Sequence, residues 1–186
     1  MSLFNTIRQR RSHKRFTARP VAPEEIKAML EAAVLAPNHK LTQPWGFVVL
    51  GARARRKYAE IKAHNKVKDE ANSELVSAKR DKIIEETAAV PGVVVVTQKW
   101  DTDPARAEED YAAVFMAIQN MLLMATSMGL GSKVNTGRIM EDSQLRALIG
   151  AARDERVVAI VHIGEPAEEL PPKARVPADD KTRWLP

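Results

Sequence analysis

Three adjacent residues near the start of the chain, Arg10, Arg11 and Ser12, form a compact set of hydrogen-bond donors. An arginine guanidinium donates parallel hydrogen bonds to phosphate oxygens, and a serine hydroxyl adds a donor on the same short turn. Lys14 and Arg15 follow closely. The cluster therefore predicts a site for a phosphorylated ligand, and the alternative interpretation is a solvated basic surface.

A second candidate site is the loop APNHKLTQP, residues 36–44, which lies between a helical pattern and the apolar run that begins at Trp45. The loop carries His39 and Gln43 just ahead of that aromatic residue. Together these side chains indicate a pocket wall. Considered separately, His39 would be an ordinary loop histidine and Trp45 a residue of the apolar core.

The residue types that are missing exclude several kinds of catalytic site. The chain has no cysteine, which removes disulfides, thiolate metal sites and cysteine nucleophiles together. It also lacks the G-x-G-x-x-G, P-loop, H-E-x-x-H and G-x-S-x-G motifs. No pair among the four histidines, His13, His39, His64 and His162, has metal-ligand spacing. We therefore expect no metal site and no catalytic triad, so redox chemistry has to come from a cofactor.

The net charge of +5 is local rather than general. The first twenty residues contain six cations and no acid, whereas the rest of the chain is nearly balanced. Proteins that bind duplex nucleic acid usually spread basic side chains over a whole face. We therefore expect no nucleic-acid partner, with a basic module that binds nucleic acid or an acidic protein as the less favoured alternative. The segment does not resemble a removable targeting peptide, and a cytoplasmic location is expected.

The spacing of apolar residues predicts helices interleaved with short strands. Helices are predicted over residues 2–10, from Pro23 to a stop at Pro37, twice within 53–88, and over 105–128 and 143–150. Strands are predicted over residues 45–50, 93–96, 132–136 and 157–163. No segment has the length and apolarity of a membrane span. Because the alternation lacks the rhythm of a doubly wound sheet, we favour an α+β sheet flanked by helices.

The length fits a single domain over residues 1–186. Residues 53–90 are mostly charged and suggest two solvated helices that form a peripheral flap. Residues 166–186 form a polar, proline-rich tail. The helix over 105–128 is apolar nearly all round, which is typical of a central helix or an oligomer interface.

The motifs RRS, AP with QPW, and a long helix that ends in GLG resemble the FMN-dependent nitroreductase family, and in particular its small NAD(P)H nitroreductase members. The likeness is strong over residues 8–50 and looser over 105–165. It implies a central mixed, mostly antiparallel sheet and a homodimer that holds two FMN molecules between its subunits. It also implies ping-pong transfer of hydride from NADPH or NADH, through flavin N5, to an organic acceptor such as a nitroaromatic or a quinone.

The resemblance also implies roles for individual residues. For the phosphate and ribityl oxygens of FMN it implies Arg10, Arg11 and Ser12, and for the ring or ribityl chain His39 of the partner subunit together with Val134, Asn135 and Thr136. Lys14 is a candidate cation near the pyrimidine end of the ring, and Leu35 and the segment from Met124 to Gly129 are candidate nicotinamide contacts.

Two positions depart from the family pattern. Leu41 stands where many larger members have asparagine, so one flavin hydrogen bond is either missing or supplied instead by His39 or Gln43. Val134 stands where many relatives have tryptophan, which changes the substrate side. The sequence chooses neither between NADPH and NADH nor between reductase and oxidase or dehydrogenase use. A flavin-binding sensor or carrier without productive reductase activity is the main alternative.

Overall fold

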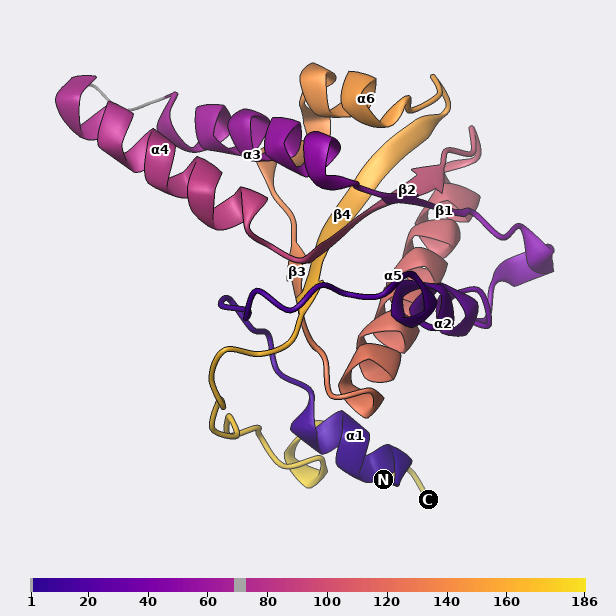
Figure 1. Cartoon of the computed structure of the whole chain (residues 1–186). Helices are drawn as coiled ribbons and strands as arrows, with labels where there is room; N and C mark the ends of the chain where they lie inside the picture. The colour runs from indigo at the N-terminus through magenta and orange to yellow at the C-terminus, as the bar shows by residue number, and fades with distance from the viewer. Residues whose placement is uncertain (1, 69–72) are drawn as a thin grey trace.

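Four strands form one sheet in the part of the chain that the computed structural model describes, residues 2–68 and 73–186 (Figure 1). They are β1 (Trp45–Val49), β2 (Gly92–Lys99), β3 (Gly131–Asn135) and β4 (Glu155–Gly164). The strand order is β1-β2-β4-β3, and every neighbouring pair is antiparallel. The α+β prediction is therefore confirmed, with an antiparallel rather than a mixed sheet, and β1 and β3 lie at opposite edges.

Helices cover both faces of this sheet (Figure 1). They are α1 (Leu3–Gln9), α2 (Pro23–Ala33), α3 (Ala52–Val67), α4 (Ser73–Ala88), α5 (Pro104–Ser127) and α6 (Ser143–Ile149). Helices α2 and α5 pack together on one face, and α3 and α6 lie on the other. Short 3-10 turns occupy His39–Leu41, Arg138–Glu141 and Asp179–Lys181.

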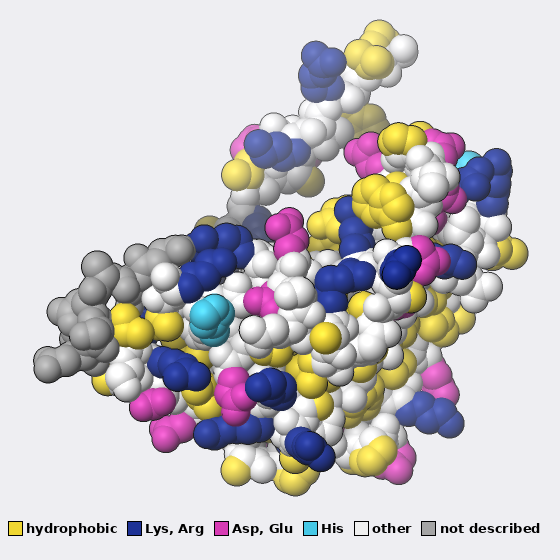
Figure 2. All heavy atoms as spheres, turned by 90° about the horizontal axis from the view of Figure 1, so that it is seen from above, with side chains coloured by type: hydrophobic (Ala, Val, Ile, Leu, Met, Phe, Trp, Pro, Cys, Tyr) yellow, Lys and Arg dark blue, Asp and Glu magenta, His cyan; other side chains and the backbone are white. Residues whose placement is uncertain are grey.

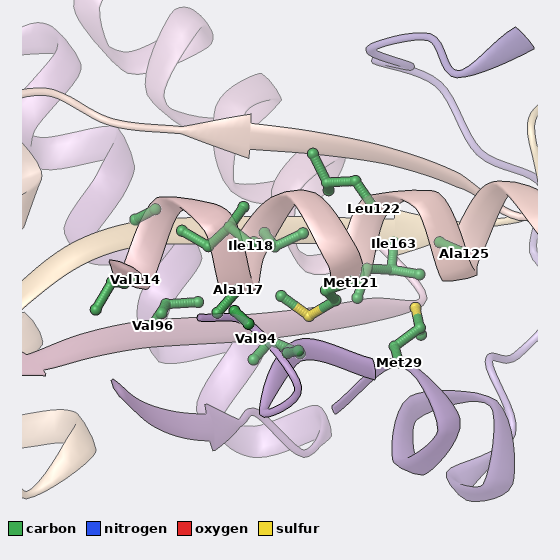
Figure 3. Close-up of a cluster of buried hydrophobic side chains, with 14 of the residues drawn as sticks. Met29, Val94, Val96, Val114, Ala117, Ile118, Met121, Leu122, Ala125 and Ile163 are labelled. Carbon is green, nitrogen blue, oxygen red and sulfur yellow. The ribbon is translucent and has the colours of Figure 1, made fainter. Parts of the chain in front are cut away.

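The valine run in β2 explains why two separate clusters of apolar side chains form. Successive side chains of a strand point to opposite faces, and here both faces are covered. Val94 and Val96 pack against α2 and α5, where Met29 and Met121 complete the larger cluster (Figure 3). Val93 and Val95 pack on the other side, against side chains of α3 and α6. The continuous run is thus a central strand.

The limits of α5 follow from local chemistry. The Asp103 side chain accepts a hydrogen bond from the Ala105 backbone N–H at 3.0 Å, and Pro104 occupies the first helical turn. The helix ends before Gly129, whose φ of 78° is accessible to glycine at little cost. The prediction of a helix over 105–128 was therefore accurate to within one residue at either end.

The prediction of two solvated flap helices was wrong for α3. Tyr58 and Ile61 of this helix are buried in the second apolar cluster. Its small residues Ala59 and Ala63 form a separate contact with Ile84 of α4. Only α4 is peripheral, and residues 69–72 lie outside the described part. The packed face of α3 consists partly of alanines that stand among charged residues. The spacing of large apolar side chains therefore predicts less burial for this helix than the structure has.

The tail does not extend freely from the sheet but returns to the N-terminal segment. Arg11 donates from Nε to the Pro171 carbonyl oxygen at 3.1 Å, and the Ala167 N–H donates to the Arg15 carbonyl at 3.2 Å.

The face shown in Figure 2 carries basic and acidic side chains interspersed, so the positive charge forms no continuous stripe there. No helix in the described part is both long enough and apolar enough to cross a bilayer.

Candidate functional site

The basic cluster at the N-terminus lines a cavity of about 360 Å³, here called the first cavity. Its walls contain Arg10, Arg11, Ser12 and Lys14, so the structure brings the predicted cluster together in a single hollow. Ser12 forms a parallel β-bridge with Ser132, which places the cluster along the outer edge of β3. This edge strand and the returning tail give the cavity its shape.

The two adjacent arginines do different things in this cavity. Arg11 donates to the carbonyl oxygens of Arg8 at 2.6 Å and of Pro171 at 3.1 Å, so it ties the cluster to the tail. Arg10 is half-buried, and its guanidinium has no hydrogen-bond or ion-pair partner within the described residues. Burial and the charges of Arg11 and Arg175 lower the pKa of Arg10. A half-buried cation without a partner favours an anionic ligand.

The tail contributes residues to the first cavity that the sequence interpretation missed. Lys173 and Arg175 line the cavity together with Leu170 and Pro171. Glu168, another lining residue, is bound to Arg15 and therefore leaves the remaining cations uncompensated. The signal was available in the sequence as two cations spaced by one residue in PKARVP, but the tail was treated as unpacked.

Two of the three predicted residues after GLG line a different hollow. Asn135 and Thr136 belong to the second cavity, of about 370 Å³, whose other lining residues are Tyr58, Lys62, Asn65, Lys66, Lys133, Gly137, Arg138 and Ile139. Val134 does not belong to it, because its side chain packs into the larger apolar cluster. Gly131, Lys133 and Asn135 alternate onto one face of β3, and Lys14 of the first cavity is near enough to Lys133 to lower its pKa. Both cavities therefore border β3, the first through the Ser12–Ser132 bridge and the second through Lys133 and Asn135.

Tyr58, which borders the second cavity, forms a buried hydrogen-bonded pair with His162. Tyr58 Oη and His162 Nε2 are 3.0 Å apart, and both side chains are nearly inaccessible. Burial raises the pKa of the Tyr58 phenol, and burial with the charges of Lys62 and Lys133 lowers the pKa of His162 to about 3. At neutral pH the imidazole is therefore uncharged. Sequence reasoning gave neither residue a role.

The His39 loop lies far from both cavities within one chain. It precedes β1, whereas both cavities lie at β3, and two strands separate these edges. At about 4.8 Å per strand, the edges are roughly 14 Å apart. His39 Nδ1 lies 2.6 Å from Glu109 Oε2 on α5, and Gln43 donates its backbone N–H to Asn38 Oδ1 at 2.9 Å. The predicted set of residues is thus not assembled by a single copy.

Side-chain contacts hold this loop in an unusual backbone conformation. Lys40, Leu41 and Gln43 have φ values of 51°, 53° and 45°, which non-glycine residues rarely adopt. Thr42 donates from Oγ1 to Asp110 Oδ1 at 2.6 Å, and Asp110 is only 4% exposed. The loop is therefore fastened to α5 by a buried carboxylate.

Replacing Thr42 with valine is expected to lower the free energy of unfolding by about 1–3 kcal/mol, because Asp110 would lose its hydrogen-bond donor. Urea unfolding followed by circular dichroism measures this change. Thr102→Val, at an exposed position without a side-chain bond to a carboxylate, is the matched control. Equal midpoints for the two variants would show that the Thr42–Asp110 bond does not fasten the loop.

The candidate nicotinamide residues are also outside the lining of both cavities. Leu35 is 80% exposed after α2, while Met124 packs partly against the larger apolar cluster. Gly129 forms the left-handed turn after α5. The described residues contain no group of three or more acidic or histidine side chains suited to a metal ion.

The chain is similar to known proteins in both sequence and fold. A sequence model described as the Nitroreductase family matches residues 7–165. The Bacillus subtilis protein YfhC, provisionally named an NAD(P)H nitroreductase, is 30% identical over 96% of this chain and 92% of its own. A nitroreductase-like family protein from Bacillus cereus has a TM-score of 0.84 and 28% identity, covering 100% of this chain and 96% of that one.

A further solved structure supports the fold alone. NfnB from Sphigopyxis sp. strain HMH, described as an FMN and NADPH-dependent nitroreductase, has a TM-score of 0.80 at 20% identity and covers 100% of both chains. The likeness therefore extends over the whole chain, tail included.

Proposed function

This chain belongs to the nitroreductase family, and we propose that it is a homodimeric oxidoreductase that uses FMN to pass hydride from NADPH or NADH to a small organic acceptor. A nitroaromatic or a quinone is the acceptor class that we propose. Its proposed location is the cytoplasm. The observation that carries the proposal is the half-buried, unpaired Arg10 in the first cavity.

The first cavity suits the phosphate of FMN. Arg10, Lys14, Lys173 and Arg175 surround it with positive charge, and Ser12 adds a hydroxyl donor. Several cations and a hydroxyl gathered in one hollow are typical of a site that a multiply charged anion completes. We assign the phosphate to this cavity on these grounds.

The remainder of the cofactor is proposed to lie along the face of β3 between the two cavities. Asn135 and Thr136 stand at the far end of this path. The Asn135 amide donates to the Ile160 carbonyl at 3.2 Å, so its position is fixed by β4. When bound, FMN supplies the hydride chemistry at N5, while this chain binds and orients the reactants.

A second copy of the chain is needed to complete the proposed site. His39 lies at the opposite edge of the sheet from Arg10, so only the partner's loop would bring the two together. A single chain also leaves Leu35 80% and Leu41 76% exposed on either side of this loop. Phe4 on α1 is 68% exposed and Trp184 of the tail 88%. Burial of such side chains would stabilise a dimer.

The net reaction needs no side chain as an obligatory acid or base. For a nitro compound, NAD(P)H, a proton and R–NO2 give NAD(P)⁺, R–NO and water. The proton is available from solvent at this open site.

The proposal is tested by anaerobic titration of the purified protein with NADPH and with NADH, followed in its visible spectrum. We expect a yellow dimer that contains FMN, loses its colour with one or both nucleotides and regains it when a nitroaromatic or quinone is added. A colourless protein that does not take up FMN would refute the proposal. A yellow protein that neither nucleotide bleaches would instead be a flavin carrier or sensor.

A further inference from the structure

The last glycine of the GLG motif stands directly opposite another glycine at the end of the sheet. Gly131, the first residue of β3, is paired with Gly164, the last residue of β4. These two residues are here called the glycine pair. Neither has a positive φ, so the backbone conformation by itself would allow a side chain at either position. The reason for glycine therefore lies in the space next to them.

Two rings from the N-terminal segment occupy that space. A Cβ atom on Gly131 would lie 2.8 Å from Cδ2 and 2.9 Å from Cγ of the His13 imidazole, and 3.0 Å from Cγ of Pro166. A Cβ atom on Gly164 would lie 3.0 Å from Cγ and Cδ1 of the Phe16 ring. Carbon atoms in ordinary contact are about 3.5–4.0 Å apart. The two rings therefore pack on the glycine pair at a distance that no side chain would allow.

Backbone hydrogen bonds attach the same segment to the end of the sheet. The His13 N–H donates to the Ser132 carbonyl at 3.0 Å, next to the parallel bridge between Ser12 and Ser132. Further along, the Thr17 N–H donates to the Glu165 carbonyl at 2.9 Å. The segment is thus fixed at two points, and the rings that pack between them set its distance from the sheet.

Side chains of this segment alternate between the sheet and the first cavity. His13 is buried against Gly131, whereas Ser12 and Lys14 on either side of it are exposed and line the first cavity. Successive side chains of an extended segment point in opposite directions. A His13 ring pushed away from the sheet would therefore also displace the backbone that carries Ser12 and Lys14.

The contact distances indicate how large this displacement would be. Moving Cδ2 of His13 from 2.8 Å to about 3.5 Å from a Cβ on Gly131 requires a shift of roughly 0.7 Å. Groups that bind a ligand have to be held to within about 0.5 Å of their productive positions. A single methyl group at position 131 is therefore enough to disturb the donors of the first cavity.

We propose that Gly131 and His13 are positioning residues for the FMN phosphate. The imidazole packed on the glycine sets the distance between the N-terminal segment and the sheet, and this distance places Ser12 and Lys14 at the first cavity. Gly131 and His13 do not line that cavity themselves, so they act through their neighbours. This inference rests on the proposed function and adds to it two residues that control how tightly the phosphate is bound.

The test measures how strongly each variant prefers FMN to riboflavin, which lacks only the phosphate. The apoprotein is titrated with both flavins, and the ratio of the two Kd values isolates the phosphate contribution, because a general folding defect weakens both. In Gly131→Ala this preference should fall about tenfold, equivalent to the loss of one charge-assisted hydrogen bond. Gly51→Ala is the matched control, since a Cβ there has no atom within 4 Å and φ is −68°. It should keep the wild-type preference.

A double variant shows whether the effect passes through the ring. His13→Ala should itself lower the preference for FMN, because the segment loses its packing on the sheet, and it adds no clash that could prevent folding. When the imidazole is absent, a Cβ at position 131 meets no ring. The double variant should therefore prefer FMN no less than His13→Ala does, so that the two substitutions are not additive.

Three results would overturn the inference. The first is an equal preference for FMN in Gly131→Ala and Gly51→Ala, and the second is an unchanged preference in His13→Ala, which also decides the matter if Gly131→Ala does not fold. The third is additive losses in the double variant, which would mean that the Cβ acts through Pro166 or the backbone. In each case a wild-type protein that prefers FMN leaves the proposed function intact. A wild-type protein that binds neither flavin would refute both.

Discussion

Replacing Arg10 with alanine is expected to weaken FMN binding by about 10-fold to 100-fold, since a charge-assisted hydrogen bond contributes roughly 1.5–3 kcal/mol. The guanidinium of Arg10 is half-buried and unpaired in the described structure, so it is available to the phosphate. Its neighbour Arg11 already donates hydrogen bonds to backbone carbonyl oxygens. Fluorescence titration of the apoprotein with FMN measures the change in Kd.

The matched control for this prediction is Arg19→Ala. Arg19 is exposed and lies 2.7 Å from Glu25, outside the first cavity. Its loss should leave the Kd for FMN unchanged. The apoprotein of Arg10→Ala should also melt no lower than the wild type, because Arg10 is repelled by Arg11 and Arg175. Equal retention of FMN in the two variants would mean that the phosphate lies elsewhere.

His162 is expected to make the protein lose stability in acid, by about 3 kcal/mol between pH 6.5 and pH 4. The pKa of this buried imidazole is lowered to about 3 in the folded chain, against an ordinary value of about 6.5 when unfolded. Between these values the unfolded chain binds a proton that the folded chain does not. The free energy of unfolding therefore falls as the pH falls through this window.

His162→Gln isolates this contribution from that of the carboxylates that titrate in the same range. Glutamine retains an acceptor for the Tyr58 hydroxyl but does not titrate. Urea unfolding at fixed protein concentration and at pH 7, 5.5 and 4.5 should show a shallower loss of stability in the variant. Parallel curves for the two proteins would mean that His162 is not held neutral in the folded state.

Much of the fold was predictable because it depends on local pattern. The valine run of β2 and the spacing of apolar residues in α5 each identify an element without knowledge of its neighbours. Arg10, Arg11, Ser12 and Lys14 could be recognised as a cluster for the same reason, since they are adjacent in the chain. The family likeness over residues 8–50 then supplied the cofactor hypothesis.

Prediction was least accurate for side chains that contact segments far away in the sequence. The packed face of α3 consists partly of Ala59 and Ala63, so a helix that looks solvated in the sequence joins the core. Val134 was predicted to contact the flavin together with Asn135 and Thr136, partly through their backbones, and the alternation of β3 directs its side chain toward the larger apolar cluster and not into the second cavity. Its backbone remains a proposed contact only.

Hydrophobic period, capping and motifs act over a few neighbouring residues, so most of the elements, the N-terminal cation cluster and the family could be predicted before the fold was known. The fold was needed to show that Lys173 and Arg175 line the first cavity, that Lys62 and Lys133 share the second, and that His39 lies at the other edge. These outcomes depend on strand order and on the path of the tail, which bring together side chains more than 70 residues apart in the chain. Burial and repulsion between neighbouring cations then shift the pKa values of those side chains, and both effects exist only in the folded chain.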